Sequence, residues 1–179
     1  MSLSNRNIQG QNIIHESPWT RWLSRPWGKD SQPYYCLELF DFVTAIALTP
    51  DDQVVLVEQY RPAVLKNTLE FPSGLMDQPH ESPEEVAKRE LLEETGWKAN
   101  RAQLVTSCHT DTGRIDNQIH IIFCDQLEAP SQEWKAEKGI HAALKSAHET
   151  QKCILNGTIS NLMHRGAWLL CREAGHIKL

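Results

Sequence analysis

The sequence predicts an α+β fold, a sheet covered by helices, and three observations indicate it. Segments rich in aromatic and β-branched residues come first and read as strands. A helix with clear end signals follows, then two more strand-like segments, and the chain closes with two helical segments. The 179 residues, 40% apolar and 23% charged, fit one globular domain with a sizeable core.

The strands are predicted from short apolar runs bounded by turn residues. These segments are 34–39, 41–48, 53–59, 103–107 and 118–123. Pro50, Asp51 and Asp52 form a turn signal between the second and third segments, so these two are expected to pair as a hairpin. Residues 110–117, with Gly113, form a turn-rich connection between the last two.

The central helix has a well-marked beginning and end. Ser82 is a good N-cap, Pro83 stands at the first helical position, and Glu85 completes a capping box. Gly96 stands just past the far end, where a left-handed residue is favoured. Residues 129–139 are polar and irregular, and residues 142–156 and 160–173 are predicted as helices.

Residues 1–40 are predicted to form an N-terminal arm with strands. Its first 17 residues are polar, and Trp19, Trp22 and Trp27 then follow within nine positions. Pro18 and Pro26 interrupt this stretch, which makes a helix unfavourable and an extended arm the expected conformation. Residues 41–179 are predicted to form the main domain.

The composition excludes several classes of protein. No apolar run approaches the roughly 18–20 residues that span a bilayer, and the N-terminus has no apolar secretory core, so we expect no membrane association. The five cysteines form no C-x-x-C pair, which favours free thiols in a reducing cytoplasm. A net charge of −5 with scattered basic residues argues against nucleic-acid binding.

Three carboxylates gather on one side of the central helix. At about 100° per residue, Glu90, Glu93 and Glu94 fall on the side that also carries Val86 and Ala87. Like charges at this spacing, near a helix C-terminus, destabilise the helix unless a cation compensates them. Carboxylate oxygens suit Mg²⁺ or Mn²⁺. The alternative is a solvated acidic face paired with neighbouring basic residues of the helix.

The same helix resembles the signature of the Nudix hydrolases, G-x5-E-x7-R-E-U-x-E-E-x-G-U, where U is apolar. Every fixed position from the first signature glutamate onward is matched, by Glu81, Arg89, Glu90, Leu91, Glu93, Glu94, Gly96 and Trp97. One departure precedes them, because six residues rather than five separate Gly74 from Glu81. The loop 77–80 is therefore one residue longer than the signature has it.

The flanking sequence resembles the ADP-ribose pyrophosphatase branch of that family, over roughly residues 41–170. VEQYR at 57–61 and LEFPSG at 69–74 are similar to its VxQYR and LExPAG stretches. Thr112 and Gly113 followed by 119–121 resemble its SPG…IH stretch, although the usual Ser-Pro is missing, and 157–159 resemble its GxI turn. This resemblance implies a Nudix-type α/β/α sandwich with a mixed sheet.

The resemblance also implies the metal site. Glu90 and Glu94 would be the principal metal ligands, with Glu93 a third ligand or a partner through water. Ser73 matches the position that binds a metal through its backbone carbonyl. The implied cofactor is Mg²⁺ or Mn²⁺.

Four more residues match positions with implied roles near the substrate or the signature loop. Arg61 and Glu70 match positions near bound substrate, and Arg61 would hold a phosphate in a guanidinium fork. Glu81 and Arg89 would pair with each other and hold the loop against the helix.

The general base is the least defined part of the implied site. In the ADP-ribose branch it is often a glutamate on an acidic loop, here residues 128–140. Glu137 matches best and Glu133 second, but this loop is less acidic than the branch pattern. Glu93, on the helix, is the other candidate.

The implied reaction is attack by water on a phosphorus of a small-molecule nucleoside diphosphate such as ADP-ribose or another nucleoside-diphosphate sugar. The products would be a nucleoside monophosphate and a sugar phosphate. Relatives in this branch commonly pair through their N-terminal strands, which implies a homodimer. The alternatives are a hydrolase of dinucleotides or nucleoside triphosphates, and a non-catalytic nucleotide-sugar sensor.

Overall fold

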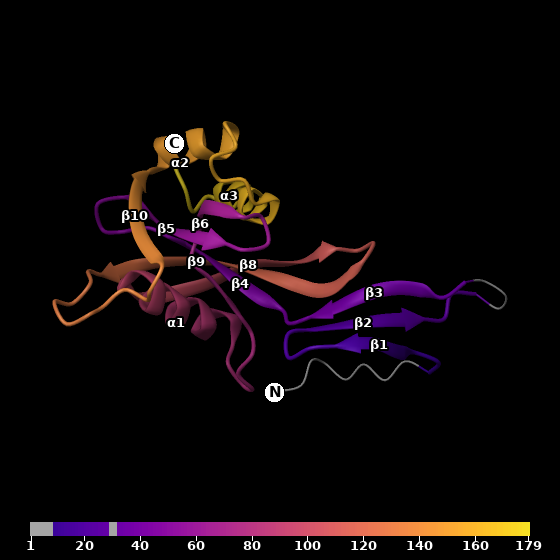
Figure 1. The fold of residues 1–179 in the computed structure, drawn as a ribbon. Helices are drawn as coiled ribbons and strands as arrows, with labels where there is room; N and C mark the ends of the chain where they lie inside the picture. Colours follow the sequence, from indigo (N-terminus) through magenta and orange to yellow (C-terminus); the bar gives the residue numbers. More distant parts are fainter. Residues whose placement is uncertain (1–8, 29–31) are drawn as a thin grey trace.

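Figure 1 shows the fold in a computed structural model, which describes residues 9–28 and 32–179. The elements in chain order are β1 (Asn12–Glu16), β2 (Thr20–Arg25), β3 (Tyr34–Leu39), β4 (Phe42–Ala47), β5 (Gln53–Arg61), β6 (Lys66–Glu70), β7 (Ser73–Leu75), α1 (Pro83–Thr95), β8 (Lys98–Asp111), β9 (Ile115–Glu128), β10 (Ile140–Ser146), α2 (Ala147–Leu155) and α3 (Leu162–Glu173). The predicted α+β class is confirmed.

The strands form two sheets that lie between helices. The larger sheet has seven strands in the order β1-β2-β3-β9-β4-β7, with β8 also paired to β9. It is mixed, because β9 runs parallel to β3 and β4 while the other pairs are antiparallel. The smaller sheet has the order β10-β5-β6. Helix α1 lies on one side of the sheets, and α2 and α3 lie on the other (Figure 1).

Strand β4 lies at the centre and contributes side chains to a hydrophobic core on each of its two faces. Val43 and Ala45 belong to the cluster that includes Val86 and Leu91 of α1, whereas Ile46 belongs to the cluster that includes α3 residues. Successive side chains of a strand point to opposite faces, so a strand buried on both faces is apolar at nearly every position. This burial fixes α1 and α3 against opposite sides of the same strand.

The predicted ends of α1 are confirmed. Ser82 Oγ accepts a hydrogen bond from the Glu85 N–H, and the Glu85 carboxylate accepts one from the Ser82 N–H at 2.7 Å. Gly96 ends the helix with φ +76, and a Cβ at this position would lie 2.7 Å from the Trp134 side chain. Glycine is therefore required both by the backbone conformation and by the close approach of the 129–139 loop.

The predicted hairpin between residues 41–48 and 53–59 is wrong. Strand β4 pairs with β9 and β7, while β5 pairs with β10 and β6 in the smaller sheet. A single bridge between Leu48 and Val54 links the two segments. The turn at Pro50 carries the chain from one sheet to the other, because β7 and β9 already occupy the two hydrogen-bonding edges of β4.

The helix predicted at 142–156 is correct only in its second half. Residues Ile140–Ser146 form β10, which pairs antiparallel with β5 from Gln53 to Gln59. Helix α2 begins after Ser146, which forms a capping box with Glu149. Pairing with β5 overrides the helical propensity of Ala142 and its neighbours. Strands β8 and β9 are also longer than predicted, and their turn is confined to the residues around Gly113.

The part of the arm that the structure describes is extended, as predicted. Strands β1 and β2 form a hairpin, and β2 pairs with β3, which joins β9 through Leu37 and Glu38. Of the polar stretch of 17 residues at the front of the arm, the first eight lie outside the described residues. Within the described ranges, no helix is long and apolar enough to cross a membrane.

Candidate active site

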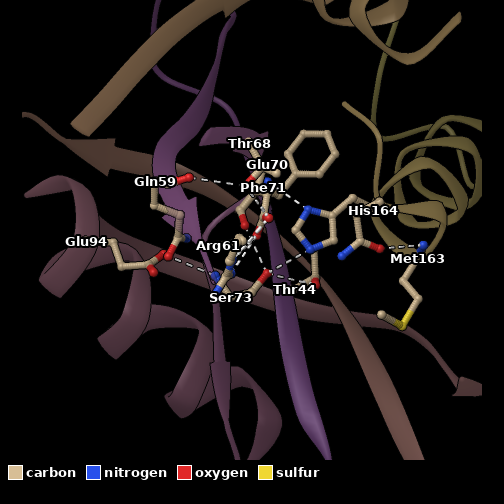
Figure 2. A network of polar contacts seen from close by, with 11 residues as sticks. Thr44, Gln59, Arg61, Thr68, Glu70, Phe71, Ser73, Glu94, Met163 and His164 are labelled. Atoms are coloured by element: carbon tan, nitrogen blue, oxygen red, sulfur yellow. Dashed lines mark hydrogen bonds and ion pairs between the residues drawn. The ribbon is translucent and has the colours of Figure 1, made fainter. Parts of the chain in front are cut away.

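The C-terminal half of α1 faces the start of β7, and one hydrogen bond joins them. The Ser73 N–H donates to Oε2 of Glu94 at 3.2 Å (Figure 2). Glu94 is only 6% exposed, so its carboxylate lies inside the protein. The predicted ligand positions Ser73 and Glu94 are thus brought together, although they are 21 residues apart in the chain.

Glu94 is a buried carboxylate with little compensation. Burial raises its pKa to about 8, the Ser73 N–H and Arg61 lower it, and the nearby Glu90 and Glu137 raise it further. Within the described ranges, Glu94 forms no ion pair. Burying an ionised carboxylate is costly unless a cation or several donors compensate it. This position therefore favours either a proton or a bound cation.

Glu90 lies one turn earlier on α1, packed against the backbone of Gly74. A Cβ at Gly74 would lie 1.9 Å from Cδ of Glu90, so only glycine leaves room for this carboxylate. Burial raises the pKa of Glu90, Arg89 lowers it, and Glu93 and Asp77 raise it. The signature glycine therefore allows β7 to approach the carboxylate side of α1.

Arg89 connects the signature loop to the helix. Its guanidinium lies 3.3 Å from Glu81, 2.6 Å from Glu90 and 3.2 Å from Glu93. The predicted pair with Glu81 is confirmed. The alternative is a solvated acidic face that pairs with basic residues of the helix. It fits Glu93, which is largely exposed and pairs with Arg89, and it fits Glu90 in part, but it does not fit the buried Glu94.

The carboxylates do not form one compact cluster in this arrangement. In the part of the chain that the structure describes, no three His, Cys, Asp or Glu side chains are grouped so that they could hold a metal ion. Glu90 is turned toward Arg89, and Glu93 extends toward solvent. Helical spacing alone suggested the cluster, but it does not fix where each side chain points.

The donor chemistry at this site nevertheless fits a divalent cation. Glu94 and Glu90 present carboxylate oxygens next to the Ser73–Gly74 backbone, and both have raised pKa values. Oxygen ligands of this kind are those that Mg²⁺ and Mn²⁺ prefer. A cation here would offset the cost of burying two neighbouring carboxylates.

Arg61 and Glu70 form a second polar group beside Ser73 (Figure 2). Arg61 Nη2 lies 2.6 Å from Glu70 Oε2, its Nε lies 3.1 Å from Oε1, and Thr68 Oγ1 donates to Oε1 at 2.7 Å. Burial raises the pKa of Glu70, but the hydrogen bonds from Arg61 and Thr68 lower it overall. Glu70 therefore stays ionised and orients the guanidinium.

A hollow of about 430 Å³ opens beside these groups. Its wall combines the polar residues of β5–β7 with apolar residues and the start of α3, namely Phe42, Arg61, Ala63, Val64, Thr68, Glu70, Ser73, Gly74, Leu75, Ser160, Asn161 and His164. The side chain of Arg61 is 41% exposed. A ligand in the hollow could therefore reach Arg61 and the Ser73–Gly74 backbone together.

The 129–139 loop approaches the C-terminal end of α1, and it is irregular, as predicted. The indole of Trp134 on this loop packs against Gly96. Glu137 is exposed but close enough to Glu94 to raise the pKa of that carboxyl group. Glu133 is also exposed.

The matching family model decides how this constellation is classified. A model of the NUDIX domain matches residues 40–151, which is more than half of the chain. The chain belongs to the Nudix family. The carboxylate helix α1, the Arg89–Glu81 pair and Gly74 are thus this chain's version of the Nudix signature.

Two of the proteins that are similar to this chain carry the name ADP-ribose pyrophosphatase. An ADP-ribose pyrophosphatase of Bacillus subtilis (strain 168) is 32% identical over 85 residues, which is 48% of this chain and 45% of that protein. An ADP-ribose pyrophosphatase of Mycobacterium tuberculosis (strain ATCC 25618 / H37Rv) is 28% identical over 131 residues, covering 70% and 61% of the two chains. The chain thus spans about half the length of the curated relatives it matches.

A solved structure shares the whole Nudix fold. The crystal structure of an ADP compounds hydrolase superposes with a TM-score of 0.77 at 19% sequence identity, and it covers 100% of both chains. The predicted Nudix-type sandwich with a mixed sheet is thereby confirmed.

Three residues near the Nudix site were not singled out from the sequence. Asp77 lies near Glu90, and Thr44 and His164 contact Ser73. The signal for His164 was its place on the inner side of a predicted helix, where a histidine is unusual. Burial lowers the pKa of His164 to about 4, although the nearby Glu70 raises it, so this imidazole is neutral.

Two other histidines lie away from the site. His109 lines a separate hollow with Arg25 and Tyr34. His120 lies on β9 and forms a hydrogen bond with Ser107 on the neighbouring strand β8.

The pKa of Glu94 predicts a pH dependence of stability for the metal-free Nudix domain. Because the folded-state pKa of about 8 exceeds the ordinary value of 4.5, the folded protein keeps a proton that the unfolded chain loses between these values. This contribution is fully present below about pH 4.5 and is lost as the pH rises through about 8. The free energy of unfolding, measured with urea at several pH values in the presence of EDTA, should therefore fall as the pH rises through this range. Glu94→Gln should make this dependence on pH weaker, and an equal dependence in both proteins would contradict the assignment.

Proposed function

We propose that this chain is a metal-dependent pyrophosphohydrolase. It cleaves the phosphoanhydride of ADP-ribose or a related nucleoside-diphosphate sugar and releases a nucleoside monophosphate and a sugar phosphate. The observation that carries the proposal is the buried Glu94 carboxylate, which lacks an ion pair among the described residues and lies beside Ser73 and the hollow. The names of the similar Bacillus and Mycobacterium proteins support this substrate class.

In this proposal Glu90, Glu94 and the carbonyl of Ser73 hold Mg²⁺ or Mn²⁺, and Glu93 binds directly or through water. Such an ion supplies charge neutralisation for the diphosphate and lowers the pKa of a water molecule. The buried position of Glu94 excludes bulk water from one side of the site, which strengthens electrostatic interactions there.

The remaining site residues act on the substrate. Arg61 lies at the hollow with its guanidinium oriented by Glu70, so its remaining N–H groups can donate to a phosphate oxygen. Because that guanidinium already pairs with Glu70, it would bind phosphate without its full bidentate fork. Recognition of the two phosphates therefore depends on positioning as much as on charge.

The same fold could act on dinucleotides or nucleoside triphosphates, or bind nucleotide sugars without catalysis. A sensor has no need for metal ligands, and this chain has Glu90, Glu93 and Glu94 at all three signature positions. Catalysis is therefore the favoured reading, and a substrate panel separates the hydrolases from one another.

Glu94→Gln tests the proposed activity. We expect a loss of roughly a hundredfold or more in kcat, since even outer contacts to a metal are worth about 10- to 100-fold. The measurement is product formation from ADP-ribose, GDP-mannose, UDP-glucose, NADH, a diadenosine polyphosphate and nucleoside triphosphates, with Mg²⁺ and with Mn²⁺. Glu84→Gln, on the first turn of α1, is the matched control and should retain activity. A fully active Glu94→Gln variant would contradict the assignment of Glu94 to the metal site.

The general base is assigned by comparing neighbouring loop carboxylates. We propose Glu137, because it lies near enough to Glu94 to affect its pKa. Glu137→Gln should lower kcat by about 10²- to 10⁴-fold, as expected for loss of a base, while Glu133→Gln should have little effect. The reverse order would move the role to Glu133. Full activity in both variants would leave Glu93, on α1, as the base.

We further propose that residues 1–40 pair two copies of the chain. Trp22, Tyr35 and Leu37 lie on one face of β2–β3 and are 46%, 45% and 37% exposed. An apolar face of this kind marks an interaction surface. Light scattering after gel filtration should give the mass of a dimer, and Trp22→Ser with Leu37→Ser should give that of a monomer. A monomeric parent protein would refute the pairing.

A further inference from the structure

His164 is buried where the first turn of α3 meets the segment Phe71–Ser73. Its side chain is 2% exposed, and its ring centroid lies 5.9 Å from that of Phe71. Asn161 caps the helix by accepting a hydrogen bond from the Met163 N–H at 2.9 Å, which fixes the turn that carries His164. The imidazole is therefore held by α3 while it faces the strand that leads into the proposed metal site.

Both ring nitrogens face polar atoms of this segment. The Phe71 N–H donates to Nδ1 of His164 at 3.1 Å, so Nδ1 carries no proton and Nε2 carries it. Nε2 lies 3.5 Å from Oγ of Ser73. The imidazole thus accepts a hydrogen bond from Phe71, which precedes Pro72, and directs its own N–H toward Ser73, which follows it. Pro72 itself has no N–H that could hold the segment.

The hydroxyl of Ser73 completes the arrangement. It donates its single proton to the Phe71 carbonyl at 2.9 Å, so it can only accept from its other two neighbours. These are Nε2 of His164 and Oγ1 of Thr44, which lies 3.0 Å away on the central strand β4. Every hydrogen-bonding position of this hydroxyl is therefore occupied, and the side chain of Ser73 has one orientation.

The backbone of the same serine faces the carboxylate helix. Its N–H donates to Glu94, and the Ser73–Gly74 backbone packs against Glu90. A continuous chain of contacts therefore runs from α3 through His164 and Ser73 to Glu94 on α1, as Figure 2 shows. The N–H and the carbonyl of Ser73 belong to the two peptide units that meet at its Cα, so a shift of the Ser73 backbone would move the carbonyl and break the hydrogen bond to Glu94 together.

We propose that His164 is a positioning residue that fixes the backbone at Ser73 so that the Ser73 carbonyl and the Glu94 carboxylate face one cation. The proposal rests on the proposed metal site. His164 acts through the Phe71–Ser73 segment and contacts neither the cation nor the reacting phosphorus. A residue that only filled this part of the core would need no nitrogen directed at the Phe71 N–H.

Two variants of His164 separate positioning from packing. His164→Asn places Oδ1 where Nδ1 stands and keeps an acceptor for the Phe71 N–H, whereas His164→Leu fills similar space and leaves that N–H unpaired. Cys171→Ala is the control, because Cys171 is buried on the same helix two turns further along and lies outside the proposed site. The unfolding temperature of each variant is measured, so that changes in metal affinity are compared between variants that have lost similar stability.

The decisive measurement is the Mn²⁺ dissociation constant, read from the electron paramagnetic resonance signal of free Mn²⁺. His164→Leu should raise it about tenfold, as for other residues that orient metal ligands. At saturating Mn²⁺ it should lower kcat for ADP-ribose with little change in KM, because the imidazole, although it lines the hollow, is only 2% exposed and offers the substrate little surface. His164→Asn should recover most of the affinity, and Cys171→Ala should lose stability without losing affinity.

Three results would overturn the positioning role. One is an unchanged Mn²⁺ affinity in His164→Leu, and another is an equal loss of affinity in Cys171→Ala. The third is a Mn²⁺ affinity in His164→Asn that is as weak as the affinity in His164→Leu. If the leucine variant does not fold, the corresponding result is an affinity in His164→Asn that is about tenfold weaker than in the parent protein. A parent protein that binds Mn²⁺ but cleaves nothing in the panel would refute the proposed hydrolase and leave the affinity comparison valid.

Discussion

The buried hydrogen bond between the Ser73 N–H and the Glu94 carboxylate is the constraint on which the site depends. It brings the C-terminal half of α1 against the start of β7, and it leaves a carboxylate inside the protein with one neutral donor. Such a group is unfavourable at neutral pH without a proton or a cation. The absence of a Cβ at Gly74 allows this close approach, because any larger residue would displace Glu90.

The core supports this constraint from both sides. Strand β4 fixes α1 through Val43 and α3 through Ile46, so the two helices keep a constant relation to the segment between them. The stacked rings of Phe71 and Trp168, whose centroids lie 6.0 Å apart, anchor the Phe71–Ser73 segment in the core. A polar site on a mobile loop would not hold a buried carboxylate in one position, whereas here the neighbouring backbone is fixed by packing and hydrogen bonds.

The sequence predicted best those features that are encoded locally. Ser82, Pro83 and Gly96 defined both ends of α1, because capping depends on a few adjacent residues. The pairing of β4 and the strand at Ile140–Ser146 could not be predicted in this way, since both depend on partners distant in sequence. For the site, the signature named Glu90, Glu93 and Glu94, but their different burial and the contact of His164 with Phe71 arise only from tertiary packing.

The most direct test of the proposed metal site is a crystal structure of the protein with Mn²⁺, with the ion located by its anomalous scattering. We expect an anomalous peak in direct contact with the Glu94 carboxylate and the Ser73 carbonyl, with Glu90 turned from Arg89 toward the ion. A fully occupied peak elsewhere, with Glu94 still bonded only to the Ser73 N–H, would contradict it.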